Sequence, residues 1–142
     1  MIEGLSHITL EVRDLDRMTR ILTGILDAQL VYDSGNATFS LSRERFFLVG
    51  GIWIAVMEGE SLPSRTYNHV AFKIRDDAFD TYQARIEALG LELRPPRPRV
   101  EGEGRSLYFY DEDNHLFELH TGTLDERLAR YSAGPGEAAG RR

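Results

Sequence analysis

Two ten-residue stretches, LSHITLEVRD at residues 5–14 and YNHVAFKIRD at residues 67–76, decide the fold of this chain. Each has a histidine in third place, apolar side chains at every second position after it, and Arg-Asp at its end. Such alternation is typical of a β-strand with one buried face. It places His7 and Thr9 on one face of the first strand and His69 on the matching face of the second. The chain therefore contains an internal repeat, and we expect its two halves to fold alike.

The same order of elements follows each of the two strands. Apolar residues at helical spacing predict one helix after Asp14 or Asp16 and another after Asp76 or Asp77, with these aspartates as N-terminal caps. Strand-like runs come next, at residues 38–41, 45–49 and 52–57 in the first half and at 91–94, 107–110 and 116–120 in the second. Hairpin turns are expected at residues 50–51 and 111–114. The order predicts an α+β fold of two tandem βαβββ modules around a common concave surface.

Length and composition restrict the classes of function. The 142 residues, 42% of them hydrophobic, suit one globular domain, expected at residues 1–131 with modules at about 1–60 and 65–125, and a disordered tail at 132–142. A net charge of -6 argues against a nucleic-acid partner. The absence of cysteine excludes thiolate ligands and cysteine nucleophiles. Without a signal peptide or an apolar run of about 20 residues, we expect no membrane association and a cytoplasmic location.

The repeat also indicates a metal site. His7 and His69 begin equivalent strands, and alignment of the last strand of each half places Ala55 opposite Glu118. Three of four symmetry-related positions thus carry side chains that can bind a metal, and the fourth leaves room for water and substrate, as a catalytic site requires. Two imidazoles and a carboxylate suit manganese, iron(II) or zinc better than calcium.

Structural roles compete with this interpretation. An isolated histidine or glutamate on a strand is more often a hydrogen-bonded or solvated residue than a ligand. His115 and His120 are further imidazoles close to Glu118, and His120 shares a strand face with Glu118, where it is a candidate to support that carboxylate. Only the repeat favours His7 and His69 over these two.

These motifs resemble a known family. GLSHIT at residues 4–9, YNHVAF at 67–72 and DNHLFELH at 113–120 resemble the vicinal oxygen chelate superfamily. The Arg43-Glu44 pair, RPPRPRVEGEGRS at residues 94–106 and YFYD at 108–111 are similar to its fosfomycin-resistance branch, and to the FosX-type epoxide hydrolases in particular. The resemblance covers roughly residues 1–131.

The resemblance implies a homodimer in which modules pair across subunits around the metal cleft. Each site would then take His7 from one subunit and His69 with Glu118 from the other. It also implies Mn(II), although other divalent metals fit the same ligands, and fosfomycin as the substrate. Water would add to the epoxide to give a vicinal diol, with the metal as Lewis acid and Glu44 as general base.

The resemblance further implies residues that contact the substrate. A phosphonate requires cations and hydroxyl donors. The positions that match such contacts, or the lining of the cleft, are Thr9, Trp53, Tyr67, Ser106, Tyr108 and Arg127, with Arg94 in the place where related transferases have a lysine.

Four other functions compete with hydration. A thiol transferase would open the same epoxide with glutathione or a similar thiol. A metal-free drug-binding protein can share the same fold, because fold alone does not determine function. A glyoxalase would usually have a fourth protein ligand where Ala55 stands, and an extradiol dioxygenase generally has a longer chain. Glu44 favours water as the nucleophile.

Overall fold

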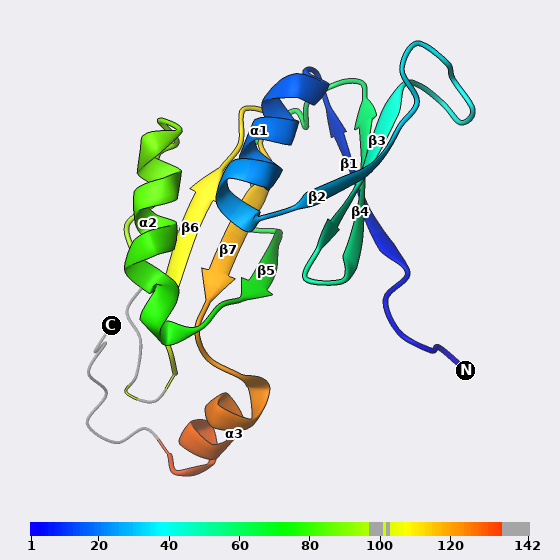
Figure 1. Cartoon of the computed structure of the whole chain (residues 1–142). Helices are drawn as coiled ribbons and strands as arrows, with labels where there is room; N and C mark the ends of the chain where they lie inside the picture. The colour runs from blue at the N-terminus through cyan, green and yellow to red at the C-terminus, as the bar shows by residue number, and fades with distance from the viewer. Residues whose placement is uncertain (97–100, 102, 135–142) are drawn as a thin grey trace. The chain divides into compact units, whose positions relative to one another are not determined.

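The structure is a computed structural model that describes residues 1–96, 101 and 103–134, in two compact units. The first unit comprises Met1–Thr66 together with Asp111–His115. Its sheet has the order β1-β4-β3-β2, with β1 at His7–Val12, β2 at Gln29–Asp33, β3 at Glu44–Val49 and β4 at Ile52–Glu58. Helix α1, Leu15–Leu26, lies along one face of this sheet (Figure 1).

The second unit comprises Tyr67–Tyr110 and Leu116–Arg142. Its sheet has the order β5-β7-β6, formed by β5 at His69–Lys73, β6 at Ser106–Tyr110 and β7 at Leu116–His120. The 3-10 turn η1, Asp76–Ala78, leads into helix α2, Phe79–Ala88, and helix α3, Leu124–Ser132, follows β7 (Figure 1). Within the described part of the chain, no helix has the length and apolar character needed to span a bilayer.

The strand registers confirm the internal repeat. Strand β1 runs parallel to β4 and pairs Thr9 with Ala55, whereas β5 runs parallel to β7 and pairs Ala71 with Glu118. Since Thr9 and Ala71 each stand two residues after a histidine, Ala55 and Glu118 occupy equivalent places. The two units therefore repeat one β-α-β pattern, and the predicted alignment of Ala55 with Glu118 is correct.

Strands β1, β3 and β4 of the first sheet each have a core face and an opposite face. The core face packs on α1 and consists of apolar side chains that are at most 8% exposed, among them Leu10, Val12, Phe47, Ile54 and Val56 with Met18, Ile21, Leu22 and Ile25 of α1. Because side chains alternate along a strand, the opposite face carries His7 and Thr9 of β1, Trp53 and Ala55 of β4, and Glu44 of β3. The predicted site residues of this half thus lie on one face of the sheet.

Several expected elements are correct. Asp14 caps α1 by accepting a hydrogen bond from the Arg17 backbone N–H at 3.1 Å. The turn between β3 and β4 uses Gly50 and Gly51 at φ values of 53° and 84°, where glycine carries no steric cost. The strand expected at 116–120 has these bounds, and those expected at 45–49, 52–57 and 107–110 agree to within one residue.

Three expectations are wrong. Residues 38–41 form no strand, because Gln29–Asp33 directly after α1 takes the place beside β3, and Phe39 and Leu41 are left 78% and 88% exposed. Residues 91–94 form only one bridge, from Leu93 to Phe109, since Pro95 and Pro96 have no N–H to continue the ladder.

The third concerns the caps expected at Asp76 and Asp77. Neither residue caps α2, whose N-cap is Ala78. Their carboxylates form ion pairs instead, Asp77 with Arg75 at 2.6 Å and Asp76 with Arg105 at 3.1 Å. The tail predicted at 132–142 lies outside the described residues from 135 onward, and α3 extends to Ser132.

Candidate metal centre

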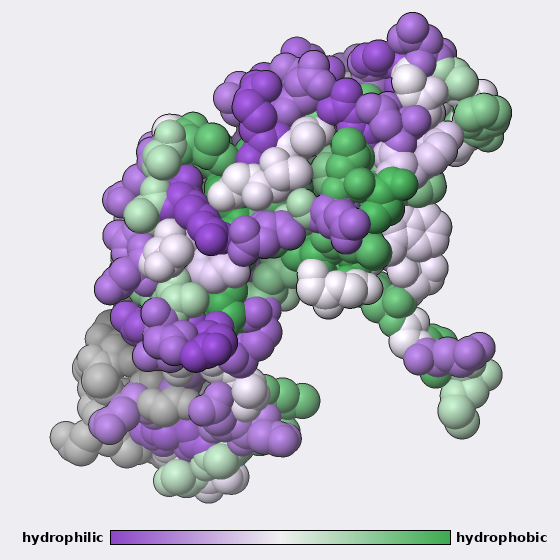
Figure 2. All heavy atoms as spheres, viewed as in Figure 1, coloured by the Kyte–Doolittle hydropathy of each residue, from purple (hydrophilic) through white to green (hydrophobic). Residues whose placement is uncertain are grey.

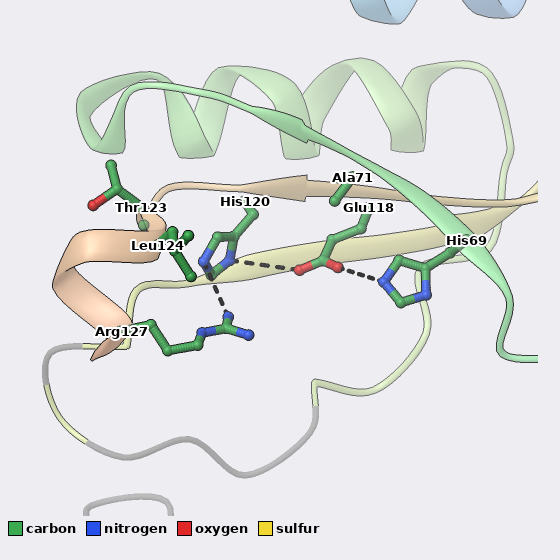
Figure 3. Close-up of a pocket in the computed structure, with 8 residues that line it drawn as sticks. His69, Ala71, Glu118, His120, Thr123, Leu124 and Arg127 are labelled. Carbon is green, nitrogen blue, oxygen red and sulfur yellow. Dashed lines mark hydrogen bonds and ion pairs between the residues drawn. The ribbon is translucent and has the colours of Figure 1, made fainter. Parts of the chain in front are cut away.

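Two of the predicted ligands lie together on the second sheet. The Nε2 atom of His69 on β5 is 2.9 Å from Oε1 of Glu118 on β7 (Figure 3). The Nδ1 atom of His69 lies 2.6 Å from the backbone carbonyl of Tyr67, which can only accept, so Nδ1 carries a proton. A metal-binding histidine is usually held in this way by its other nitrogen.

The donor atoms of this pair fit a divalent cation. In the neutral ring, Nε2 presents a lone pair to a carboxylate oxygen, and two such atoms repel unless a positive charge lies between them. Metal bonds of about 2.0–2.2 Å place neighbouring ligands about 3 Å apart, close to the 2.9 Å that separates Nε2 and Oε1. In the absence of metal, a protonated His69 paired with Glu118 satisfies the same geometry.

Glu118 is 5% exposed and is held by hydrogen bonds from neighbouring side chains. The Ser106 hydroxyl donates to Oε2 at 2.5 Å, and Tyr108 is a further hydrogen-bond partner. Burial by itself would raise the pKa of Glu118, but the Ser106 hydrogen bond and the electrostatic effects of His120 and His69 outweigh it and hold the pKa below its ordinary value. The carboxylate is thus kept ionised, the form that binds a metal.

A pocket of about 330 Å³ opens beside these two ligands (Figure 3). It extends from His69 and Glu118 to the start of α3 and combines charged, polar and small side chains. Its lining residues are His69, Ala71, Glu118, His120, Gly122, Thr123, Leu124 and Arg127. The pocket offers space for a small anionic molecule next to the metal ligands.

His7 stands on the first sheet, on the face opposite α1. Its Nδ1 lies 2.9 Å from the Ser6 hydroxyl, and its ring packs against the Trp53 ring at 4.2 Å between centroids. Among the residues that the structure describes, no three His, Cys, Asp or Glu side chains gather into a metal-binding group. Two of the three predicted ligands are therefore together within the second unit, and His7 as the third stays a prediction.

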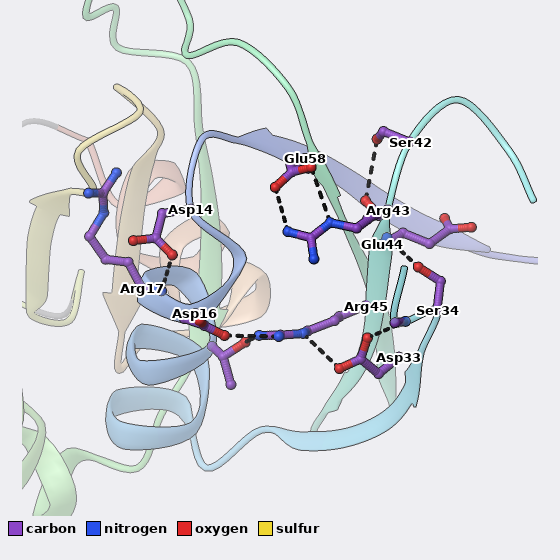
Figure 4. Close-up of polar contacts among 12 residues, drawn as sticks. Asp14, Asp16, Arg17, Asp33, Ser34, Ser42, Arg43, Glu44, Arg45 and Glu58 are labelled. Carbon is purple, nitrogen blue, oxygen red and sulfur yellow. Dashed lines mark hydrogen bonds and ion pairs between the residues drawn. The ribbon is translucent and has the colours of Figure 1, made fainter. Parts of the chain in front are cut away.

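Glu44 differs from the solvated, ion-paired residue that its two arginine neighbours suggest. It is 7% exposed, at the first position of β3. Both flanking arginines point to the opposite side of the strand, where Arg43 binds Glu58 at 2.7 Å and Arg45 binds Asp33 at 3.1 Å (Figure 4). Within the described part of the chain, nothing hydrogen-bonds or ion-pairs with the Glu44 carboxylate, so it is available to accept a proton.

The remaining candidate contacts fall on the two sheet faces just described. Thr9 is exposed on β1 and pairs with Ala55, and Trp53 has a buried indole N–H with no hydrogen-bond partner among the described residues. The Tyr67 hydroxyl donates to that of Tyr108 at 3.0 Å. Arg94 lies 5.5 Å from the centre of the Tyr110 ring.

Two features of the site were not predicted from the sequence. Ser106 and Tyr108 bind Glu118 directly, and the partly buried Arg127 contacts His120 at 3.3 Å. The available signal was strand alternation, since Ser106, Tyr108, Glu118 and His120 all share one face. Their roles as substrate contacts stay predictions.

Comparison with known proteins agrees with this fold. The model of the Glyoxalase/Bleomycin resistance protein/Dioxygenase superfamily matches residues 4–119, and the chain belongs to this superfamily. The fosfomycin resistance protein FosX of Mesorhizobium japonicum is 68% identical over 94% of this chain and 96% of its own length. Within the superfamily, the chain therefore belongs with the FosX proteins.

Solved structures and more distant relatives extend the comparison. A point mutant of FosX from Listeria monocytogenes, solved with Mn(II) and 1S,2S-dihydroxypropylphosphonic acid, has a TM-score of 0.85 and 58% identity, covering 92% of this chain and 99% of its own. The metallothiol transferase FosB of Shouchella clausii is 35% identical over 92% of this chain and 88% of its own.

Removal of one ligand tests the metal centre. We expect His69→Ala to weaken Mn(II) binding by about 100-fold or more, because loss of a supporting residue alone costs 10–100-fold. The matched control is His115→Asn, which removes an imidazole but keeps a donor for Asp111, 2.7 Å from Nδ1 in the native protein. Titration of free Mn(II) by electron paramagnetic resonance measures both. Native affinity in His69→Ala, or an equal loss in the control, would contradict the assignment.

Proposed function

We propose that this chain is a Mn(II)-dependent hydrolase that adds water to the epoxide of fosfomycin and so confers resistance to this antibiotic. The observation that carries the proposal is the Glu44 carboxylate, which is buried, unpaired among the described residues and on the same sheet face as His7. The phosphonate bound to Listeria FosX supports it, because that molecule is a vicinal diol, the product type of epoxide hydration.

His7, His69 and Glu118 would hold the metal. A bound Mn(II) supplies Lewis acidity that stabilises negative charge on the epoxide oxygen as the ring opens. His69 contributes Nε2, freed for this purpose by the hydrogen bond at Nδ1. Glu118 contributes Oε1, while Ser106 occupies its Oε2.

Glu44 would act as the general base. A water molecule attacks one epoxide carbon while its proton passes to the Glu44 carboxylate, and the carbon–oxygen bond of the ring breaks. The ring oxygen then takes up a proton, so the product carries two neighbouring hydroxyls and the net change is the addition of one water. A base in this position typically accelerates a reaction about 10²–10⁴-fold.

The phosphonate would be held by hydroxyl and cationic side chains. Arg127 and Arg94 supply positive charge, and Thr9 lies on the same strand face as His7. Ser106, Tyr108 and Tyr67 carry hydroxyls on or beside the second sheet; Ser106 donates to Glu118 and Tyr67 donates to Tyr108, so each would redirect its proton to contact the phosphonate. Trp53 would line the cleft with an indole N–H that has no partner among the described residues. Charge-assisted hydrogen bonds of this kind are the strong ones for an oxyanion.

A homodimer would complete each site, with His7 from one subunit and His69 with Glu118 from the other. Apolar side chains exposed in the described chain support an interface. Figure 2 shows apolar surface on the N-terminal segment and on the loop after β2, where Ile2, Leu5, Phe39 and Leu41 are 69–89% exposed. We expect the enzyme to act in the cytoplasm.

The nucleophile tests the proposal against the thiol-transferase alternative that FosB represents. Incubation of the protein with fosfomycin, Mn(II) and ¹⁸O-enriched water should give a diol that carries one ¹⁸O atom, detected by mass spectrometry. Addition of glutathione should leave the rate unchanged. Turnover that depends on a thiol and yields no diol would contradict hydration, and binding of the drug without turnover or Mn(II) would support a sequestering protein.

Replacement of the base gives a second test. Glu44→Gln should lower kcat about 10²–10⁴-fold because the amide cannot accept the proton, with Mn(II) affinity close to native. Glu60→Gln is the matched control, because that side chain is 86% exposed and should retain full activity. Diol production by Glu44→Gln at the native rate would remove Glu44 from its role.

A further inference from the structure

We infer that His120 is a positioning residue for the metal site, which it controls through Ser106. It determines which oxygen of Glu118 is presented to the metal. This inference rests on the proposed role of Glu118 as a ligand. His120 follows Glu118 by two residues on β7, and its side chain is 14% exposed. Its ring lies between the guanidinium of Arg127 and the hydroxyl of Ser106, in the pocket of Figure 3.

The donor groups fix the direction of this chain of contacts. The guanidinium of Arg127 can only donate, and it lies 3.3 Å from Nε2 of His120, so Nε2 accepts. The neutral ring then carries its one proton on Nδ1, 2.7 Å from the Ser106 oxygen. Ser106 accepts this bond and is left with its own hydroxyl proton to donate.

The Ser106 proton is directed at Glu118. The Ser106 oxygen is 2.5 Å from Oε2 of Glu118, whereas His120 Nδ1 is 3.5 Å from the same atom and too distant for a good hydrogen bond. His120 therefore acts on Glu118 through the serine. With Oε2 held, Oε1 is the oxygen that faces Nε2 of His69 at 2.9 Å.

Two glycines make room for the His120 ring. A Cβ atom on Gly122 would lie 2.8 Å from Nε2 of His120 and 2.8 Å from the Glu103 carbonyl oxygen. On Gly104, at φ +88°, it would lie 3.2 Å from Cε1 of the ring and 2.8 Å from the Gly122 nitrogen. Contacts below 3.0 Å force a displacement, so the backbone here is built closely around the imidazole. Such fitting is expected for a residue that orients a ligand.

Two conservative substitutions separate the nitrogens of His120. Asparagine places an amide where Nδ1 stands and can still donate to Ser106. Glutamine places its amide one atom further out, near Nε2, and can still accept from Arg127 but not donate to Ser106. We expect His120→Gln to weaken Mn(II) binding about 10–100-fold, as for loss of a supporting residue, and His120→Asn to bind within about 3-fold of the native protein.

Mn(II) affinity is measured by electron paramagnetic resonance without substrate, with circular dichroism to establish that each variant is folded. Equal losses of Mn(II) affinity in the two variants would show that the shape of the ring matters and the donor at Nδ1 does not. Native affinity in His120→Gln would show that Ser106 binds Glu118 without support from His120. Either result overturns the inference. A native protein that binds Mn(II) but does not hydrate fosfomycin contradicts the proposed function alone. A native protein that binds no Mn(II) contradicts both.

A second variant covers the case in which His120→Gln does not fold. Ser106→Ala should lose Mn(II) affinity to the same degree, because it breaks the same chain at the next residue. The double variant Ser106→Ala/His120→Asn should bind no more weakly than Ser106→Ala, since residues in one network are not additive. Native affinity in Ser106→Ala would overturn the inference.

Discussion

The short distance between a ring nitrogen and a carboxylate oxygen is the constraint on which the site depends. Nε2 of His69 and Oε1 of Glu118 lie 2.9 Å apart, and the hydrogen bond from Nδ1 to the Tyr67 carbonyl leaves Nε2 without a proton in the neutral ring. Such a pair is stable only around a positive charge. The surrounding groups preserve the pair, since Ser106 holds the second carboxylate oxygen and keeps it ionised. The rest of the sheet supplies the parallel register that brings β5 and β7 side by side.

The two sheets share one register and differ in chemistry at equivalent positions. Glu44 pairs with Met57 on the first sheet as Ser106 pairs with His120 on the second, so the proposed base Glu44 and Ser106 occupy matching places. Ala55 likewise matches Glu118. One half thus presents His7 and a carboxylate, Glu44, that has no partner among the described residues, and the other presents His69 with a carboxylate that contacts Ser106 and His69. Divergence of a repeated module would therefore explain how two similar sheets provide different parts of the proposed reaction.

Much of the fold was predictable from the sequence because alternation and glycine placement act locally. The strands around His7 and His69, the cap at Asp14 and the turn at Gly50-Gly51 follow from such local rules. The strand predicted at 38–41 was wrong because alternation shows that a segment can pair with another strand. It does not show which of two segments takes the place beside β3. The caps predicted at Asp76 and Asp77 were wrong because arginines bind both carboxylates. Arg105, distant in sequence, binds Asp76, and the nearby Arg75 binds Asp77.

The sequence identified His69 and Glu118, which the structure brings together, and named His120 as a candidate support for Glu118, but it did not show the other groups around the pair. The repeat selects His7, His69 and Glu118, whereas the burial of Glu44 and the contact of Arg127 with His120 depend on tertiary packing. The most direct test of the account is a crystal structure grown with Mn(II), with anomalous diffraction to locate the metal. The account predicts one peak per chain between Nε2 of His69 and Oε1 of Glu118, completed by the partner subunit's His7. A peak elsewhere, for example beside His115, or none next to His69, would contradict it.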